Sequence, residues 1–466
     1  MNPMTHDVTD LVVLGAGSGG YAAALRAAGL GLSVTLIERD RIGGTCLHRG
    51  CIPTKAMLHA GELADAARSA AEWGVHTEFD GVDAATLLAR TDRTVHRLHT
   101  GLRGLIAAAG ITTVEGDGEL VVDRAGPGVR VADRTVRGRT VVLATGARPR
   151  RLPVAPLDGE RIISSDQALR LDRVPERVAV IGGGVIGVEF ASLWASLGAR
   201  VHLLEAADRL LLGEDADIAA DFTRSFTRRG VDVRVGAEIT AVRRDGDLVH
   251  LDLAGERLEV DTVLVAVGRE PVTEAFAGAG VGLTDSGHVR VDDRLATDIA
   301  GVVAVGDLVA GPQLAHRGFA HGIFVAEDAA HAAGGLPRPP MPMADRDLPR
   351  ITYADPQVAS VGLGERAARA EYGDIEVHTS ELAGNARAQL NGGRGLVKVI
   401  RVADGPVVGI AAVGPGVGEL MGSGQLIVGW GAHPDEVAAL VHAHPTLGEA
   451  LGEAHLALAG KPLHLR

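Results

Sequence analysis

A glycine-rich turn between a strand and a helix, present twice, constrains the fold of this chain more than any other feature. The apolar run 11–14 leads into the first turn at 15–20, an Ala-rich helix follows, and the next strand ends at Glu38, 18 residues after Gly20. Glycines at such a turn let the backbone approach a pyrophosphate, which the amides at the helix N-terminus hold, while the terminal acid accepts a ribose hydroxyl. The pattern predicts a dinucleotide-binding βαβ unit.

The second copy has its strand at 178–181, its glycine turn at 182–187 and its acid at Glu205, 18 residues after Gly187. Duplication within one chain is the economical explanation, and it implies two bound dinucleotides. We therefore expect an α/β fold with two Rossmann-like domains, within a chain of 466 residues that is long enough for about three domains.

The only two cysteines, Cys46 and Cys51, lie together in the segment GGTCLHRGCIPTK. A disulfide that closes so small a loop contributes only about 2 kcal/mol, which is minor for a chain that can bury several cores. Residues five apart in a straight helix are about 7.5 Å apart along the axis. Because a disulfide needs Cα atoms roughly 4.4 to 6.8 Å apart, the chain must bend, and Gly50 and Pro53 allow this. A strained disulfide is easily reduced, so the pair is predicted to be catalytic.

Composition excludes several classes of function. The net charge is -13 and aromatic residues are only 3%, which disfavours nucleic acid and anionic membranes as partners. No apolar run approaches the roughly 18 residues that span a bilayer. The first ten residues, MNPMTHDVTD, are polar and resemble no targeting peptide, so we expect a cytoplasmic location. We expect no metal site.

The two sequence segments GGTCLHRGCIPTK and HAHPTLGE, the latter at 442–449, resemble the redox-active disulfide and the His-Glu signature of the flavoprotein disulfide reductases, class I of the pyridine nucleotide-disulfide oxidoreductases. The resemblance extends over essentially the whole chain and is greatest to the members that oxidise dihydrolipoamide. His48, Arg49 and Thr54 depart from the Asn-Val and Ser commonest in those members, which bears on substrate preference and flavin tuning. The resemblance implies a homodimer whose third domain is a C-terminal α+β dimerisation domain.

The resemblance also assigns roles near the thiols. Cys46 would exchange with the substrate, Cys51 would face the flavin, and Lys55 would place a positive charge beside the reduced flavin. Glu189, in the helix after the second glycine turn, resembles the glutamate that pairs with this lysine.

His444 is the candidate base. A dithiol with a pKa near 8.5 needs a base at neutral pH, and a histidine serves if a carboxylate holds its other ring nitrogen. Glu449 supplies that carboxylate from within a helix that we expect Pro445 to open. His442 lacks the following proline and is assigned no chemical role. In related reductases this histidine reaches the disulfide of the opposite subunit, so each active site would need both chains.

FAD is expected in the first site and NAD in the second. The residues expected to contact FAD are Gly15, Gly17, Ser18, Gly20, Glu38, Arg39, Gly44, Thr45, Lys55, Gly116, Thr145, Gly146, Asp307, Leu314 and Ala315. Those expected to contact NAD are Gly182, Gly184, Val185, Ile186, Gly187, Glu205, Gly268 and Arg269.

The acid that ends the second copy also bears on the choice of nucleotide. Glu205 would accept a ribose 2'-hydroxyl and repel a 2'-phosphate. Arg209 is the only cation nearby in the sequence, and Asp208 offsets it. The sequence therefore favours NAD over NADP.

Four segments are expected along the chain. These are a FAD-binding domain at 1–148, an NAD-binding domain at 149–272, a segment that completes the FAD domain at 273–343, and the interface domain at 344–466. A stretch at 334–342, opened by two glycines and rich in proline, is the expected linker before the last segment.

These expectations lead to one function and two alternatives. The chain would oxidise protein-bound dihydrolipoyl groups with NAD as part of 2-oxo acid dehydrogenase complexes, with a lipoyl-bearing acyltransferase and the glycine cleavage lipoyl carrier as partners. The alternative enzyme is an NAD(P)H-dependent reductase of mycothione or glutathione disulfide. The alternative outside catalysis is a flavin-binding assembly component without thiol chemistry. Mercuric reductases and large thioredoxin reductases need further cysteines or a selenocysteine near the C-terminus, and no cysteine follows Cys51.

Overall fold

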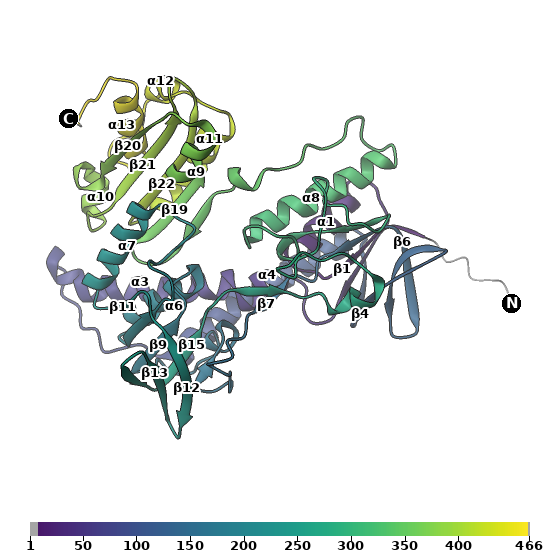
Figure 1. Ribbon diagram of the computed structural model, residues 1–466, viewed down its shortest axis with the longest axis horizontal. Coiled ribbons are helices and arrows are strands. Elements are labelled where there is room, and N and C mark those ends of the chain that lie inside the picture. Colours follow the sequence, from purple (N-terminus) through teal and green to yellow (C-terminus); the bar gives the residue numbers. More distant parts are fainter. Residues whose placement is uncertain (1–7, 465–466) are drawn as a thin grey trace. The chain divides into compact units, whose positions relative to one another are not determined.

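The computed structural model describes residues 8–464 and divides into two compact units (Figure 1). The first unit contains the chain up to residue 56, together with 89–150 and 269–345. The second contains 57–88, 151–268 and the chain from 346 onward. Within the described residues, no helix combines the length and apolar character needed to cross a membrane.

The first unit is built on a sheet whose strands follow the order β3-β2-β1-β6-β5-β4, with β17 paired to β6. Strands β1, β2, β3, β17 and the end of β6 are parallel. The last four residues of β1 and the last three of β6 are buried without alternation, as expected for strands covered on both faces. Strands β4 and β5 form antiparallel hairpins with the start of β6. The bounds are β1 Thr9–Leu14, β2 Val34–Glu38, β3 Thr112–Glu115, β4 Gly118–Asp123, β5 Gly126–Val131, β6 Arg134–Leu143 and β17 Val302–Ala304.

Two helices of the first unit pack closely against each other. A Cβ added at Gly322 in α8 would lie 2.3 Å from the carbonyl oxygen of Gly19 in α1, so only glycine permits this approach. The helices of this part of the chain are α1 Ser18–Gly29, α2 Gly44–Arg49, α3 Cys51–Ser69, α4 Ala84–Ala108 and α8 Ala315–Ala332, of which α3 and α4 each continue from one unit into the other. A two-stranded ribbon joins β7 Ala147–Pro149 to β16 Arg269–Pro271.

The second unit contains a second parallel sheet, in the order β11-β10-β9-β15-β8. An antiparallel sheet, β12-β13-β14, is inserted in the sequence between β11 and β15 of this parallel sheet. The bounds are β8 Ile162–Ile163, β9 Arg177–Ile181, β10 Arg200–Leu204, β11 Asp232–Arg234, β12 Ile239–Asp245, β13 Leu248–Leu253, β14 Glu256–Val260 and β15 Thr262–Val265, with helices α5 Ser165–Ala168, α6 Val185–Ser196 and α7 Ala216–Arg228.

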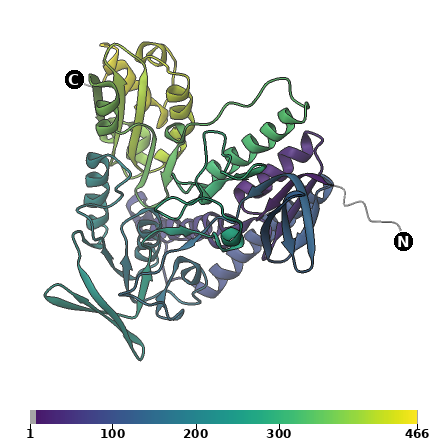
Figure 2. The ribbon, with the colours of Figure 1, turned by 45° about the vertical axis from the view of Figure 1, so that its right-hand side comes forward.

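The C-terminal part of the second unit is an antiparallel sheet in the order β18-β19-β22-β21-β20, flanked by helices (Figure 2). Its strands are β18 Arg350–Thr352, β19 Gln357–Gly362, β20 Ile375–Glu381, β21 Leu396–Val402 and β22 Val407–Gly414, and its helices are α9 Glu365–Tyr372, α10 Ala386–Leu390, α11 Met421–Gly429, α12 Pro434–Ala438 and α13 Gly448–Leu458. Two dinucleotide-binding α/β sheets and a C-terminal α+β domain are thus present, and the predicted fold class is confirmed.

A buried lysine connects this C-terminal sheet to the start of α7. Lys398, only 2% exposed, lies 3.1 Å from Asp215, 2.9 Å from Asp217 and 2.8 Å from Glu365. Three carboxylates therefore surround one ammonium group, and they keep it charged. Desolvation alone would lower the pKa of Lys398, but the hydrogen bonds and charges of these carboxylates outweigh it and raise that pKa.

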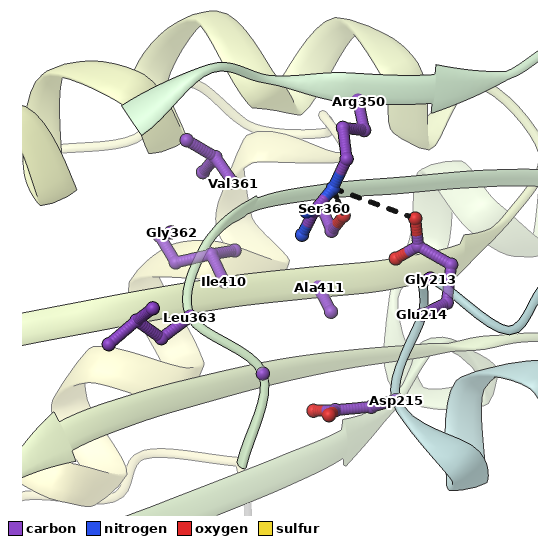
Figure 3. Close-up of a pocket in the computed structure, with 11 residues that line it drawn as sticks. Gly213, Glu214, Asp215, Arg350, Ser360, Val361, Gly362, Leu363, Ile410 and Ala411 are labelled. Carbon is purple, nitrogen blue, oxygen red and sulfur yellow. Dashed lines mark hydrogen bonds and ion pairs between the residues drawn. The ribbon is translucent and has the colours of Figure 1, made fainter. Parts of the chain in front are cut away.

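A small pocket lies beside this cluster (Figure 3). Its charged walls are already paired: Arg350 lies 3.8 Å from Glu214 and donates to the Ser360 hydroxyl at 3.1 Å, and Asp215 accepts the backbone N–H of Glu365 at 3.0 Å. Burial raises the pKa of Glu214. None of the predicted site residues lines this pocket, and its groups stabilise the junction between the loop at 213–215 and the sheet.

Candidate active site

The two glycine turns have the same geometry. The first glycine of each turn has a positive φ, +102° at Gly15 and +113° at Gly182. A Cβ at Gly20 would lie 1.8 Å from the carbonyl oxygen of Gly15, and a Cβ at Gly187 would lie 1.8 Å from that of Gly182. Only glycine therefore allows each helix to start directly against its strand, as the sequence predicts.

The two terminal acids also bind the backbone in the same way. Glu38 accepts the N–H of Ala16 at 2.7 Å through one oxygen and that of Asp40 at 2.9 Å through the other. Glu205 accepts the N–H of Gly183 at 2.6 Å and that of Ala207 at 2.8 Å. A carboxylate offers about four acceptor positions, so each acid retains capacity for a ribose hydroxyl.

The helix starts beside these acids are suited to a pyrophosphate. Gly17 and Gly184 are the N-cap residues of α1 and α6, and no side chain caps either helix. A Cβ added at either glycine would have no atom within 4 Å, so there is open space beside the free amides. Amides at a helix N-terminus attract phosphate. The residues present therefore fit two dinucleotides.

Other residues predicted to contact FAD gather around the start of α1. Gly116 donates its N–H to the carbonyl of Glu38 at 2.9 Å. A Cβ at Gly44 would lie 2.6 Å from Gly17 Cα, so α2 starts against α1. The Thr145 hydroxyl, just after β6, donates to the carbonyl of Val272 at 2.5 Å.

The predicted bend separates the two cysteines. Helix α2 ends at Arg49, Gly50 is non-helical with φ -147° and ψ -117°, and α3 begins at Cys51. Pro53 lies in the first turn of α3, where a missing N–H costs nothing. The bend therefore lies at Gly50 alone, and Pro53 accommodates the new helix.

Both cysteines are free thiols, and their side chains hydrogen-bond to each other. This hydrogen bond, followed by burial, raises the pKa of Cys46, while the charge of Lys55 and a hydrogen bond from the Ser18 hydroxyl act in the opposite direction. The net effect of these surroundings is to disfavour ionisation of Cys46.

Sequence reasoning missed Tyr21, which lies in the first turn of α1. Burial, followed by the nearby charges of Cys46 and Cys51, raises the pKa of Tyr21 to about 12. The phenol is therefore neutral at physiological pH and stands close to the thiols. A tyrosine directly after a glycine turn gives no sequence signal of this proximity.

Asp307 lies in a short 3₁₀ turn, Gly306–Leu308, and two side chains of α8 form hydrogen bonds to the backbone around it. The buried Arg317 donates to the carbonyl oxygens of Val309 at 3.1 Å and Ala310 at 2.8 Å, and its Nε donates to Asp345 at 2.6 Å. From the same helix, His321 Nδ1 accepts the N–H of Gly306 at 3.2 Å. These contacts fix the backbone on both sides of Asp307.

Charge and burial oppose each other at Asp307. Burial raises the pKa of its carboxyl, while Arg269, Arg317 and His288 act to lower it. Arg269 lies in the first unit, as Asp307 does, and its guanidinium also donates to the carbonyl of Ala147.

Glu189 is buried in α6, with 4% exposure, and its Oε1 accepts the N–H of Tyr353 at 3.0 Å. Lys55 and Glu189 belong to different units, so their pairing stays a prediction.

On the loop after Glu205, Arg209 approaches Asp208 only at 3.8 Å. The acid predicted to offset this cation is therefore a weak partner.

His444 and Glu449 form the predicted pair. His444 Nδ1 lies 2.8 Å from Glu449 Oε1, and the other carboxylate oxygen accepts the N–H of Thr446 at 2.8 Å. The bond to Thr446, followed by that to His444, lowers the pKa of Glu449. The imidazole is 74% exposed, so its other nitrogen is open to a substrate.

The expectation that Pro445 opens the helix is wrong. Helix α13 begins at Gly448, with Leu447 as its N-cap. The intervening residues form a turn instead, in which the Thr446 hydroxyl donates to the carbonyl of Ala443 at 2.7 Å. His442 packs against Gly452 of α13, where a Cβ would lie 2.4 Å from its ring.

Comparison with known proteins identifies the family. Residues 9–322 match the pyridine nucleotide-disulphide oxidoreductase model, and residues 348–455 match the dimerisation domain of the same group. The chain belongs to the pyridine nucleotide-disulphide oxidoreductase family. Membership with a dimerisation domain supports a homodimer.

Individual relatives match this family member over nearly its full length. Dihydrolipoyl dehydrogenase 3 of Pseudomonas aeruginosa is 37% identical, covering 97% of this chain and 98% of that protein. The mitochondrial dihydrolipoyl dehydrogenase of Pisum sativum is 34% identical, covering 98% and 93%. The crystal structure of LpdA from Mycobacterium tuberculosis has a TM-score of 0.86 and 29% identity, covering 97% and 100%.

Proposed function

We propose that this protein is a dihydrolipoyl dehydrogenase, an FAD enzyme that oxidises protein-bound dihydrolipoyl groups with NAD. The observation that carries the proposal is the pair of hydrogen-bonded thiols, Cys46 and Cys51, at the bend between α2 and α3, beside the uncapped start of α1. Relatives that carry the name dihydrolipoyl dehydrogenase at 34% and 37% identity support the substrate class.

In the oxidised protein, Cys46 and Cys51 form a disulfide. A substrate thiolate attacks Cys46 Sγ, which breaks the disulfide and leaves Cys51 as a thiolate. The second substrate thiol then attacks the mixed disulfide, so the substrate leaves as its own disulfide and Cys46 is released as a thiol. The raised pKa of Cys46, set by its hydrogen bond to Cys51, supports this division of roles.

His444 would accept the protons that the substrate thiols lose. Its Nδ1 faces Glu449, so the exposed Nε2 is the nitrogen open to the substrate. When bound, FAD supplies a two-electron acceptor between the thiols and NAD. The charge of Lys55 opposes the rise in the pKa of Cys46, which favours the thiolate form.

The residues that would hold the cofactors form two sets. FAD would be held by Gly15, Gly17, Gly20 and Glu38, by the turn at Asp307, and by the other residues assigned to it from the sequence. Glu205, placed on the backbone of its own glycine turn, would bind the ribose of NAD and repel the phosphate of NADP.

The assembly follows from the same proposal. In a homodimer, His444 of one chain would serve the thiols of the other. A lipoyl-bearing acyltransferase of a 2-oxo acid dehydrogenase complex would be the main partner, and the lipoyl carrier of glycine cleavage a second one, in the cytoplasm. The segments 1–148, 149–272, 273–343 and 344–466 would then act as FAD, NAD, FAD-completing and interface segments.

Steady-state rates test this function. Oxidation of dihydrolipoamide by NAD should exceed, by at least about 100-fold in kcat/KM, the reduction of glutathione disulfide or mycothione by NADPH or NADH. Faster reduction of either small disulfide would make the protein a low-molecular-weight disulfide reductase. Bound flavin without turnover of any of these substrates would support an assembly component.

A further inference from the structure

One helix of the first unit carries an unusual charge pattern for this acidic protein. Helix α4 (Ala84–Ala108) exposes Arg90, Arg93, His96, Arg97 and Arg103, and we call these five residues the basic face. The helix contains a single acidic residue, although the whole chain has a net charge of -13. Its buried residues Thr91, Val95 and Ile106 lie on the opposite side.

The arginines of the basic face have no carboxylate partners. Within residues 8–464, no carboxylate oxygen lies within 4.0 Å of any of these four guanidinium groups. Arginines elsewhere on the surface are commonly paired, as Arg148 is with Glu270 at 2.8 Å and Arg401 with Glu376 at 2.8 Å. Within the described residues, these four arginines are therefore not ion-paired, and they outnumber Asp92, the single acidic residue of the helix.

The basic face begins next to the helix that carries the substrate thiol. His48, two residues after Cys46 in α2, is 3% exposed, and its ring meets that of His99 in α4 edge to face, with centroids 4.9 Å apart. Burial lowers the pKa of His99, and the positive charges of His48, Arg103 and Arg41 lower it further. Helix α4 thus contacts α2 through this ring pair, and Arg103 and His96 of the basic face lie near His99.

We propose that the basic face docks the acidic surface of a carrier protein that presents its dihydrolipoyl arm to Cys46. This inference rests on the proposed function and names the surface that selects its protein substrate. Charges are screened beyond about 8 Å at physiological ionic strength. A small carrier domain that contacts only this region would therefore interact mainly with the basic face. A nucleic acid or a membrane would extend over the rest of the acidic surface and be repelled.

Charge neutralisation on the helix provides the test. The variant Arg93→Gln/Arg97→Gln removes two cations of the basic face. Its matched control is Arg224→Gln/Arg228→Gln, which removes two exposed cations with the same spacing from α7. Each holoenzyme is assayed with NAD and three dithiols: free dihydrolipoamide, a reduced lipoyl domain of net negative charge, and that domain with its carboxylates amidated.

At low ionic strength, Arg93→Gln/Arg97→Gln should lose about tenfold in kcat/KM for the acidic domain, since electrostatic steering acts on association. At 0.5 M salt the difference should largely vanish. The rates with free dihydrolipoamide and with the amidated domain should change less than twofold, as should all rates of the control.

Three results would overturn the inference. They are an unchanged rate with the acidic domain, an equal loss in the control variant, and a loss that appears equally with free dihydrolipoamide. Each of these leaves the proposed function in place, because wild-type oxidation of free dihydrolipoamide measures that separately. If the wild-type protein bound a 20-base single-stranded DNA in preference to the acidic domain, the basic face would be a nucleic-acid site and the inference would also fail.

Discussion

We expect the turn at Asp307, which Arg317 and His321 contact from α8, to make bound flavin sensitive to acid through His321. This histidine is 6% exposed, and its Nδ1 accepts the N–H of Gly306 at 3.2 Å. Burial, reinforced by the charge of Arg317 and opposed by Asp345, lowers the pKa of His321 to about 4. Protonation would remove the acceptor of the Gly306 amide and place a second cation beside Arg317.

The magnitude follows from proton linkage. An unfolded histidine takes up its proton near pH 6.5, whereas folded His321 does so only near pH 4. Between these values the unfolded state binds more protons, so the stability of the folded state falls as the pH falls. A difference of about 2.5 pKa units corresponds to a loss of about 3 kcal/mol between pH 6.5 and pH 4.

Flavin fluorescence measures the effect, because FAD is quenched in the protein and bright after release. The His321→Gln variant keeps an oxygen acceptor for Gly306 but cannot titrate, so it should retain flavin at a pH at which the wild-type protein releases it. His331→Gln, on the same helix, removes a histidine from a different environment and should behave like the wild-type protein. The reasoning is refuted if His321→Gln and the wild-type protein release flavin at the same pH.

Three further predictions concern the base, the nucleotide and the buried lysine. His444→Gln should retain flavin and the dimer but slow dithiol oxidation by about 10² to 10⁴, and His442→Gln is its neighbouring control. Mixing the His444→Gln and Cys46→Ser variants should restore part of the activity through heterodimers. Demonstrable heterodimers without recovery would contradict a shared site. Glu205→Ala should weaken NAD binding by roughly 1 to 3 kcal/mol, measured by fluorescence titration, and should weaken NADP binding less, so equal losses would refute the proposed selectivity. Lys398→Met leaves three carboxylates without their ammonium partner and should destabilise the protein by about 3 kcal/mol in urea unfolding, whereas exposed Lys461→Met should cost less than about 0.5 kcal/mol; similar costs for the two variants would show that Lys398 is dispensable.

The sequence predicts the parts of this fold that depend on local pattern. Both glycine turns could be read because only glycine permits the 1.8 Å approach at Gly20 and Gly187. The acids are also at the predicted places, since β2 ends at Glu38 and Glu205 directly follows the end of β10 at Leu204. The bend between the cysteines could be read from the length of a helical turn and from Gly50. The pairing of His444 with Glu449 also depends on residues only five apart.

Features that arise from packing between distant segments could not be predicted. Arg317 and His321 bind a turn that precedes them in the chain, and nothing in an Ala-rich helix indicates that its arginine and histidine point inward. Lys398 meets carboxylates about 180 residues earlier in the chain, Asp215 and Asp217. The start of α13 was misplaced because a proline is compatible with the first turn of a helix but does not require one there.

Anaerobic reduction of the purified flavoprotein tests the central claim most directly. One equivalent of dihydrolipoamide should produce a long-wavelength band from the Cys51 thiolate against oxidised flavin, and NAD should abolish the band while NADH forms. The Cys51→Ser variant should lack the band. Persistence of the band in Cys51→Ser with its loss in Cys46→Ser would reverse the two thiol roles, and direct flavin reduction without either thiol would contradict the account.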